Sequence, residues 1–246
     1  MKSNKIPFFV LLCVMIGSLV AITDAIAQTY FSDNFDNPKE SEKKWVPLYG
    51  QWEFKDKEYH QLKNDINCMS VVSDDYWKDE WNNYTFEFKA SKISGAEGFL
   101  IMFRCMGIMQ NRGVAVNAPP PRMGKDKVSL QYWWNIGGWA NARSQVESWG
   151  GTGGANSNDT IKTGEWYDIK IVNTPTKYTL YLNGKEIGSV NDSTQDGKGR
   201  IGLATWSTLA KFDDVVVYGS KGPSQQTVEP KGKATTTWAY IKLRQN

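Results

Sequence analysis

WYDIKIVNTPTKYTLYLNGKEIGSV, residues 166–190, is the stretch of sequence that decides the fold. Its first part alternates, with Tyr167, Ile169 and Ile171 on one face of a strand and mostly polar residues on the other. This pattern is typical of a strand with one buried and one wet face. Two more strand patterns flank Asn183-Gly184. Asn-Gly between two strands predicts a hairpin with a type I′ turn, because both central residues of that turn need a positive φ.

Similar runs, separated by turn residues, continue through residues 31–218. Residues 84–90 alternate apolar and polar side chains, whereas Phe99–Phe103 is apolar on both faces and is predicted to lie at the centre of a sheet. No long amphipathic helix pattern follows residue 27. The sequence therefore predicts an all-β fold, an antiparallel jelly-roll β-sandwich.

The N-terminus has the features of an export signal. Lys2 and Lys5 precede an apolar run from Phe8 to Ile22, and Ala25-Ile26-Ala27 has the small-x-small pattern of a cleavage site. The alternative is a retained membrane anchor, which needs roughly 20 apolar residues. We predict a signal peptide over residues 1–27, a secreted, periplasmic or cell-surface location, and no membrane contact after cleavage.

The remaining chain divides into a predicted sandwich domain, residues 28–219, and a tail, residues 220–246. The tail begins as a linker rich in Ser, Gly, Pro, Gln and Lys and ends in a short strand-like segment. Removing residues 1–27 lowers the formal net charge from +3 to +2. A nearly balanced chain argues against nucleic acid as a partner, because nucleic acids require a dense basic surface.

Cysteine and histidine are scarce. Cys68 and Cys105 remain after signal cleavage, and either a disulfide between them or two buried free thiols fits an exported protein. His60 is the only histidine. A single histidine and no Cys/His cluster argue against both a zinc site and a Ser/His/Asp triad.

Aromatic residues are in surplus, with 11 Trp, 11 Tyr and 10 Phe. On an exported β protein, such a surplus suggests flat platforms on which sugar rings stack. The alternative is a heavily aromatic core.

Several segments resemble concanavalin A-like (laminin-G-like) sandwich domains. They are Gly50–Phe54, Gly95–Ile101, Tyr132–Trp139, Gly164–Lys170 and Tyr181–Lys185. The Gly-Ala-Glu-Gly-Phe and Tyr-Trp-Trp-Asn segments are similar to the non-catalytic domain appended to α-L-arabinofuranosidases. The resemblance covers most of residues 31–219, and it implies arabinose-containing plant polysaccharide as the ligand. It also implies an accessory domain without the catalytic barrel of those enzymes.

The densest group of candidate binding residues surrounds Tyr132–Trp139. Trp134 shares strand parity with Leu130 and Tyr132 and is expected in the core, which leaves Trp133 as a platform and Trp139 in the following loop. Packing over the sheet remains an alternative for each. Planar or charged side chains would orient the sugar. The candidates are Asn135, Asn141, Arg104, Arg143 and Glu97.

Catalysis is the alternative to binding. Glycoside hydrolysis uses two carboxyl groups about 5–10 Å apart, and laminarinase-like enzymes carry a Glu-x-Asp-x-x-Glu array that is missing from this sequence. Glu97 and Glu147 are the carboxylates within the distinctive motifs. We predict a non-catalytic, polysaccharide-binding protein. A small glycoside hydrolase of the arabinofuranosidase or glucanase type using Glu97 or Glu147, and an adhesion module with a protein partner, remain alternatives.

Aspartates gather in the first and last predicted strands of the sandwich. If these strands pair, Asp33, Asp36 and Asp213 would approach one another, and their oxygens could hold a structural calcium ion. Solvated or capping aspartates are the alternative. No cofactor is expected to be required.

Overall fold

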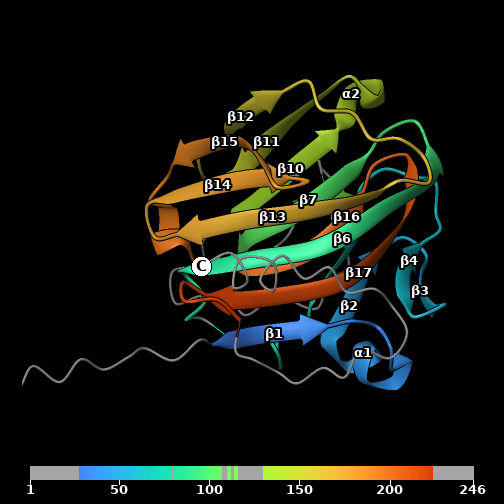
Figure 1. Cartoon of the computed structure of the whole chain (residues 1–246), viewed down its shortest axis with the longest axis horizontal. Coiled ribbons are helices and arrows are strands. Elements are labelled where there is room, and N and C mark those ends of the chain that lie inside the picture. Colours follow the sequence, from blue (N-terminus) through green and yellow to red (C-terminus); the bar gives the residue numbers. More distant parts are fainter. Residues whose placement is uncertain (1–27, 79, 107–109, 112–113, 116–129, 224–246) are drawn as a thin grey trace, which may run out of the picture.

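The structure is a computed structural model that describes residues 28–78, 80–106, 110–111, 114–115 and 130–223. The predicted signal peptide and the tail segment after residue 223 lie outside these residues. Two antiparallel sheets pack face to face (Figure 1). The predicted all-β antiparallel sandwich is confirmed.

The first sheet has eight strands. Its order is β15 (Lys185–Asn191), β14 (Lys177–Leu182), β13 (Trp166–Thr174), β6 (Tyr84–Gly95), β17 (Thr208–Gly219), β4 (Glu58–Gln61) and β3 (Trp52–Lys55), with β1 (Thr29–Asp33) paired to β17. In Figure 1 this sheet faces the viewer.

The second sheet has seven strands and lies behind the first. Its order is β12 (Gly154–Ser157), β11 (Arg143–Trp149), β10 (Leu130–Gly137), β7 (Phe99–Met106), β16 (Arg200–Thr205), β5 (Cys68–Val72) and β2 (Trp45–Tyr49). The smaller elements are the β8–β9 pair (Gln110–Asn111 and Val114–Ala115), α1 (Pro38–Lys44), α2 (Gly138–Asn141) and a 3₁₀ turn (Thr194–Gly197). No helix in the described part of the chain is long and apolar enough to cross a bilayer.

The stretch that decides the fold behaves as predicted. Tyr167, Ile169 and Ile171 are buried between the sheets. Asn183 and Gly184 have φ values of 49° and 76°, so they form the central pair of the β14–β15 hairpin with the positive φ that a type I′ turn requires. All of Phe99–Phe103 is buried, and β7 occupies the middle of the seven-stranded sheet. Both predictions are confirmed.

Much of the aromatic surplus fills the core. Trp45, Trp77, Trp81 and Trp134 are no more than 3% exposed. Trp149 and Trp166, in contrast, are 59% and 40% exposed. The core interpretation is therefore confirmed for the four buried tryptophans, and the platform interpretation stays a prediction.

The two cysteines are free and buried. In the strand register, Cys68 of β5 lies opposite Thr205 of β16, and Cys105 of β7 lies opposite Arg200 of β16. The two cysteines are therefore about five residues, roughly 16 Å, apart along the direction of β16. A disulfide needs Cα atoms within about 7 Å. Burial raises the pKa of the Cys105 thiol to about 12 and that of Cys68 to about 11. The alternative of two unreactive, buried thiols therefore applies.

Candidate functional site

The outer face of the seven-stranded sheet carries the predicted platform tryptophan. In β10, Tyr132 and Trp134 point into the core, so Trp133 points to the opposite face, where it is half-buried. The expectation that Trp134 belongs to the core and Trp133 does not is confirmed. In β11, Ser144 and Val146 are buried, so the residues between them point outward with Trp133.

Strand register brings a second tryptophan to this face. Trp133 lies opposite Glu147, and Gln131 lies opposite Trp149. Trp133 and Trp149 are therefore diagonal neighbours on adjacent strands, a relation that places Cα atoms about 7–8 Å apart. We name this surface the β10–β11 face. Its residues are Gln131, Trp133, Asn135, Arg143, Gln145, Glu147 and Trp149.

The rest of this outer face is apolar. Met69, Val71, Leu100, Met102 and Ala204 form a cluster in which no residue is more than 3% exposed. Partly buried side chains pack against the cluster. They are Val46, Leu48, Trp133 and Trp206. On β10 and β11 the accessible polar and aromatic residues of this face are Trp133, Arg143, Gln145, Glu147 and Trp149, because Gln131 and Asn135 are buried.

At the end of β10 the chain makes a tight left-handed turn. Trp139, Ala140 and Asn141 have φ values of 51°, 60° and 62°. Each such residue costs roughly 1–2 kcal/mol unless its surroundings hold it there. The Ala140 N–H donates to Glu97 Oε1 at 3.3 Å, which ties the turn to the loop between β6 and β7.

Asn141 and Arg143 complete this turn. Asn141 Nδ2 donates to the Ile161 carbonyl at 2.9 Å, and Asn141 Oδ1 accepts from the Ile161 N–H at 2.7 Å. The Arg143 guanidinium lies 4.0 Å from the centroid of the Trp139 ring. Glu97 and Asn141 therefore hold backbone, whereas Trp139 and Arg143 form an ordered cation–π pair next to the β10–β11 face.

Arg104, also predicted to orient a sugar, lies elsewhere. It is fully buried between the sheets, where Nε donates to Asn173 Oδ1 at 2.5 Å and Nη2 to the Thr174 carbonyl at 2.8 Å. Its guanidinium also lies 3.7 Å from an Asp192 carboxylate oxygen. A side chain occupied in this way does not reach a ligand on the outer face.

The three aspartates predicted to hold calcium bond to protein groups. Asp33 accepts from Ser41 Oγ at 2.9 Å and from Trp45 Nε1 at 3.0 Å. Asp36 pairs with Lys57 at 3.1 Å, and Asp213 accepts the N–H of its neighbour in the chain. β1 pairs with β17 as expected, but the described residues contain no group of three or more His, Cys, Asp or Glu side chains that could hold a metal ion.

Sequence reasoning missed Trp149. Its position in the sequence carries the needed signal, because Trp149 shares strand parity with Gln145 and Glu147. A strand predicted over residues 143–149 would have placed it on the same face as Trp133.

Comparison with known proteins places the sandwich in a family. A family model described as a 3-keto-alpha-glucoside-1,2-lyase-like domain matches residues 37–218. An extracellular exo-alpha-L-arabinofuranosidase of Streptomyces chartreusis is 32% identical over 177 residues, which are 70% of this chain. The chain spans only 18% of the length of that relative.

Solved structures agree on the fold. A carbohydrate-binding module from Bacillus subtilis superposes with a TM-score of 0.52 and 17% identity, covering 71% of this chain and 95% of that one. A Bacillus subtilis protein of unknown function with a galectin-like fold gives 0.54 at 15% identity, covering 78% and 96%. The predicted concanavalin A-like sandwich and the resemblance to a domain of arabinofuranosidases are confirmed.

Proposed function

Because the chain belongs to the 3-keto-alpha-glucoside-1,2-lyase-like domain family, whose matched region is the sandwich itself, we propose that it is an exported carbohydrate-binding protein that holds polysaccharide on the β10–β11 face without cleaving it. The observation that carries this proposal is the diagonal pairing of Trp133 and Trp149 on adjacent strands. Two flat rings on one sheet face provide stacking surfaces for neighbouring sugar units of one chain.

The chemistry around these rings suits hydroxyl-rich ligands. Gln145 and Glu147 lie on β11 with Trp149, opposite Asn135 and Trp133 of β10, and the Arg143–Trp139 pair lies at the start of that strand. The indole N–H of Trp133 is buried and donates no hydrogen bond to any residue that the structure describes. A sugar oxygen would satisfy this donor only if the Trp133 ring turned to expose it, and that bond would remove a free-energy cost of the unbound protein.

Arabinose-containing plant polysaccharide is the proposed ligand. Its support is the 32% identity to a domain-sized part of an arabinofuranosidase described as extracellular. The basic and apolar N-terminal residues 1–27 support export in the same way.

The proposal is tested by binding of the full chain to arabinan and arabinoxylan, with a mixed-linkage glucan for comparison. Trp133→Ala and Trp149→Ala should each weaken binding by about 1–3 kcal/mol, roughly 5- to 150-fold, by analogy with stacking of other flat ligands. Trp166→Ala is the matched control, because Trp166 is an exposed tryptophan on the other sheet. Unchanged binding by both platform variants, or loss in the control alone, would refute the proposed face.

One observation favours a second candidate, glycoside hydrolysis. Glu147 lies directly opposite Trp133, where a bound sugar would contact it. Among the described outward positions of β10, β11, β7, β16 and β5, however, Glu147 is the only carboxylate, and hydrolysis uses two. Release of reducing sugar from arabinan by the wild-type chain, abolished in Glu147→Gln, would establish this candidate instead.

A further inference from the structure

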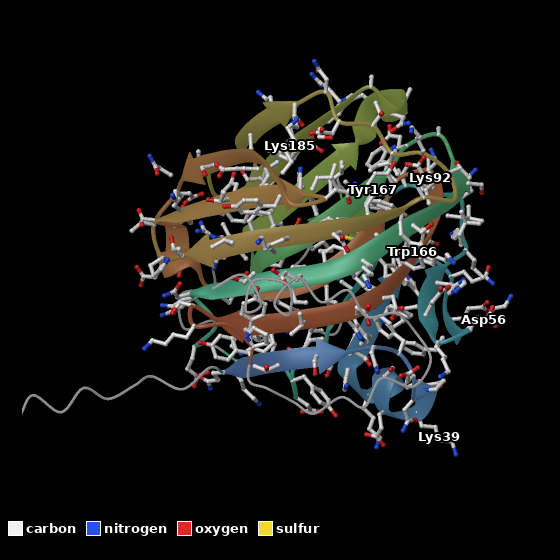
Figure 2. The ribbon with its side chains drawn as sticks, viewed as in Figure 1. Lys39, Asp56, Lys92, Trp166, Tyr167 and Lys185 are labelled. Carbon is white, nitrogen blue, oxygen red and sulfur yellow. The ribbon has the colours of Figure 1, made fainter. Side chains whose placement is uncertain are left out.

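A pocket of about 430 Å³ lies apart from the β10–β11 face, at the turn of the β14–β15 hairpin. Three segments line it: the loop from Asn158 to Lys162, the start of β13, and the hairpin turn from Leu182 to Ile187. Tyr167 and Lys185, two of its lining residues, are labelled in Figure 2. The pocket is an open surface depression rather than an enclosed cavity, and its volume lies toward the lower end of the range of about 300–1,000 Å³ found for small-molecule sites.

The walls of the pocket are held by hydrogen bonds between side chains and backbone. Tyr167 Oη accepts from the Lys162 N–H at 2.9 Å and donates to Glu165 Oε2 at 3.2 Å. Asn183 Oδ1 accepts the Asp168 N–H at 2.9 Å, which fixes the hairpin turn against β13. The pocket is therefore formed before any ligand arrives, which lowers the entropic cost of binding.

The loop on the opposite wall is fixed as well. Ser144 Oγ donates to the Asp159 carbonyl at 3.0 Å, and Ser157 Oγ donates to the Asp159 carboxylate at 2.5 Å. Asn141 holds the same loop through both of its bonds to Ile161. The described lining residues of the pocket include none of the β10–β11 face and neither member of the Trp139–Arg143 pair, so the two surfaces are distinct.

The lining combines an apolar part with charged groups of both signs. Leu182 and Ile187 provide the apolar part, and Lys162, Lys185, Asp159 and Glu165 provide formal charges that cancel. Lys162 is paired with Glu165 at 3.3 Å. Lys185 is exposed, and its side chain has no hydrogen-bond or ion-pair partner among the residues that the structure describes.

This composition matches a sugar ring better than an ion. A hydroxyl group both donates and accepts, so a sugar can use carboxylates and ammonium groups at once, while its C–H face packs on apolar side chains. Because the charges balance, a neutral ligand gains these bonds without leaving an excess charge in the pocket. We propose that the pocket is a second glycan site, which takes one or two neutral sugar units at the end of a chain, with Lys185 donating to their hydroxyl groups.

The test is a titration of the full chain with neutral monosaccharides and their methyl glycosides. Calorimetry measures the affinity, and ¹H–¹⁵N chemical-shift mapping locates the site. L-arabinose, D-galactose, D-xylose and D-glucose are the probes, and D-galacturonate is the charged comparison. We expect at least one neutral sugar to bind and to shift the amide signals of residues 158–162 and 182–187. Lys185→Ala should weaken this binding about tenfold or more, because a hydrogen bond from a charged donor is lost.

Two further variants keep the test decisive. Lys177→Ala is the control, because Lys177 is an exposed lysine of the same hairpin that does not line the pocket. Thr160→Arg places a long side chain at an exposed position of the pocket wall and should block binding without touching the core. The proposal is overturned if neutral sugars shift no pocket signals, if Lys185→Ala and Thr160→Arg bind as the wild type does, or if galacturonate binds better than every neutral sugar.

Failure here is distinguishable from failure of the proposed function. Trp133→Ala should weaken polysaccharide binding on the β10–β11 face and leave the monosaccharide shifts of the pocket unchanged. A chain that binds polysaccharide but shows no pocket shifts would retain the proposed function and lose only this inference. A chain that binds monosaccharide in the pocket but no polysaccharide would do the reverse.

Discussion

The two outer faces of the sandwich are built differently. On the eight-stranded sheet, ion pairs run between neighbouring strands: Lys89 Nζ lies 2.8 Å from Asp214, and Lys211 Nζ lies 3.2 Å from Glu58. The side chains drawn in Figure 2 cover this face toward the viewer. On the seven-stranded sheet, the outward positions hold the apolar cluster and the tryptophans of the β10–β11 face. The cluster contains Met69, Val71, Leu100, Met102 and Ala204.

This difference distinguishes a solvated, charged face from the apolar and aromatic face that we propose binds glycan. An antiparallel sheet that packs on one side normally alternates apolar and polar residues, as the eight-stranded sheet does. The seven-stranded sheet keeps apolar residues on both sides of its central strands, and those of its outer face are no more than 3% exposed, so they are covered rather than in contact with water. Even the exposed Trp166 of the charged face is held by Lys211, whose Nζ lies 4.7 Å from the ring centroid.

We expect the largest loss of stability from breaking the ion pair between Arg104 and Asp192, which is buried between the two sheets. Arg104→Met would leave the Asp192 carboxylate buried without its guanidinium partner, and breaking a buried pair costs about 3–5 kcal/mol. Urea unfolding of the variant measures this loss. A loss below about 1 kcal/mol would mean that the buried pair contributes no more than the pairs on the charged face.

Arg104 also illustrates what the sequence does not reveal. Phe99, Ile101 and Phe103 point into the core, so simple alternation places Arg104 outside. Its φ is 48°, and the pairing of β7 with both neighbours shifts register beside it, so a bulge turns the side chain inward. No residue pattern in that strand predicts the bulge, whereas the residues Asn183-Gly184 themselves predict their turn.

The candidate site also contains some features that the sequence predicts and others that it does not. Trp133 and Trp149 follow from strand parity alone, and the sequence therefore contains that part of the face. Glu97 and Asn141 bond to the backbone of Ala140 and Ile161, which approach them only after folding. Local patterns predict which way a side chain points, but not which distant backbone group it meets.

A reciprocal exchange tests the two faces directly. Met102→Lys would place an ammonium group in the apolar cluster, and we expect a loss of at least about 2 kcal/mol of unfolding free energy, the size of a large core truncation. Lys170→Met, on the charged face, should change stability by less than about 1 kcal/mol. Similar losses in thermal unfolding for both variants would remove the distinction between the faces.

Acid should weaken the interactions of Asp192 only at low pH, because its pKa is lowered in the folded protein. Burial alone would raise the pKa of Asp192, but hydrogen bonds from Thr194, Tyr132 and the Thr152 N–H outweigh it and hold the pKa below the ordinary 3.8. The stabilisation is therefore complete above that value and is lost as the pH falls through the folded-state pKa. The stability difference between wild type and Asp192→Asn should narrow as the pH drops below about 4, and a constant difference down to acid unfolding would contradict this.

The smallest effect is expected from the charged face itself. Lys89 and Asp214 are about one-quarter to one-third exposed, at 26% and 34%, and exposed pairs contribute about 0–1 kcal/mol. Lys89→Ala should therefore lower the unfolding free energy by no more than about 1 kcal/mol, and by less in about 1 M salt, where the Debye length falls to about 3 Å. A larger, salt-insensitive loss would mean that the charged face is also a packed surface. The contrast between the two sheets would then no longer support the proposal that the β10–β11 face binds glycan.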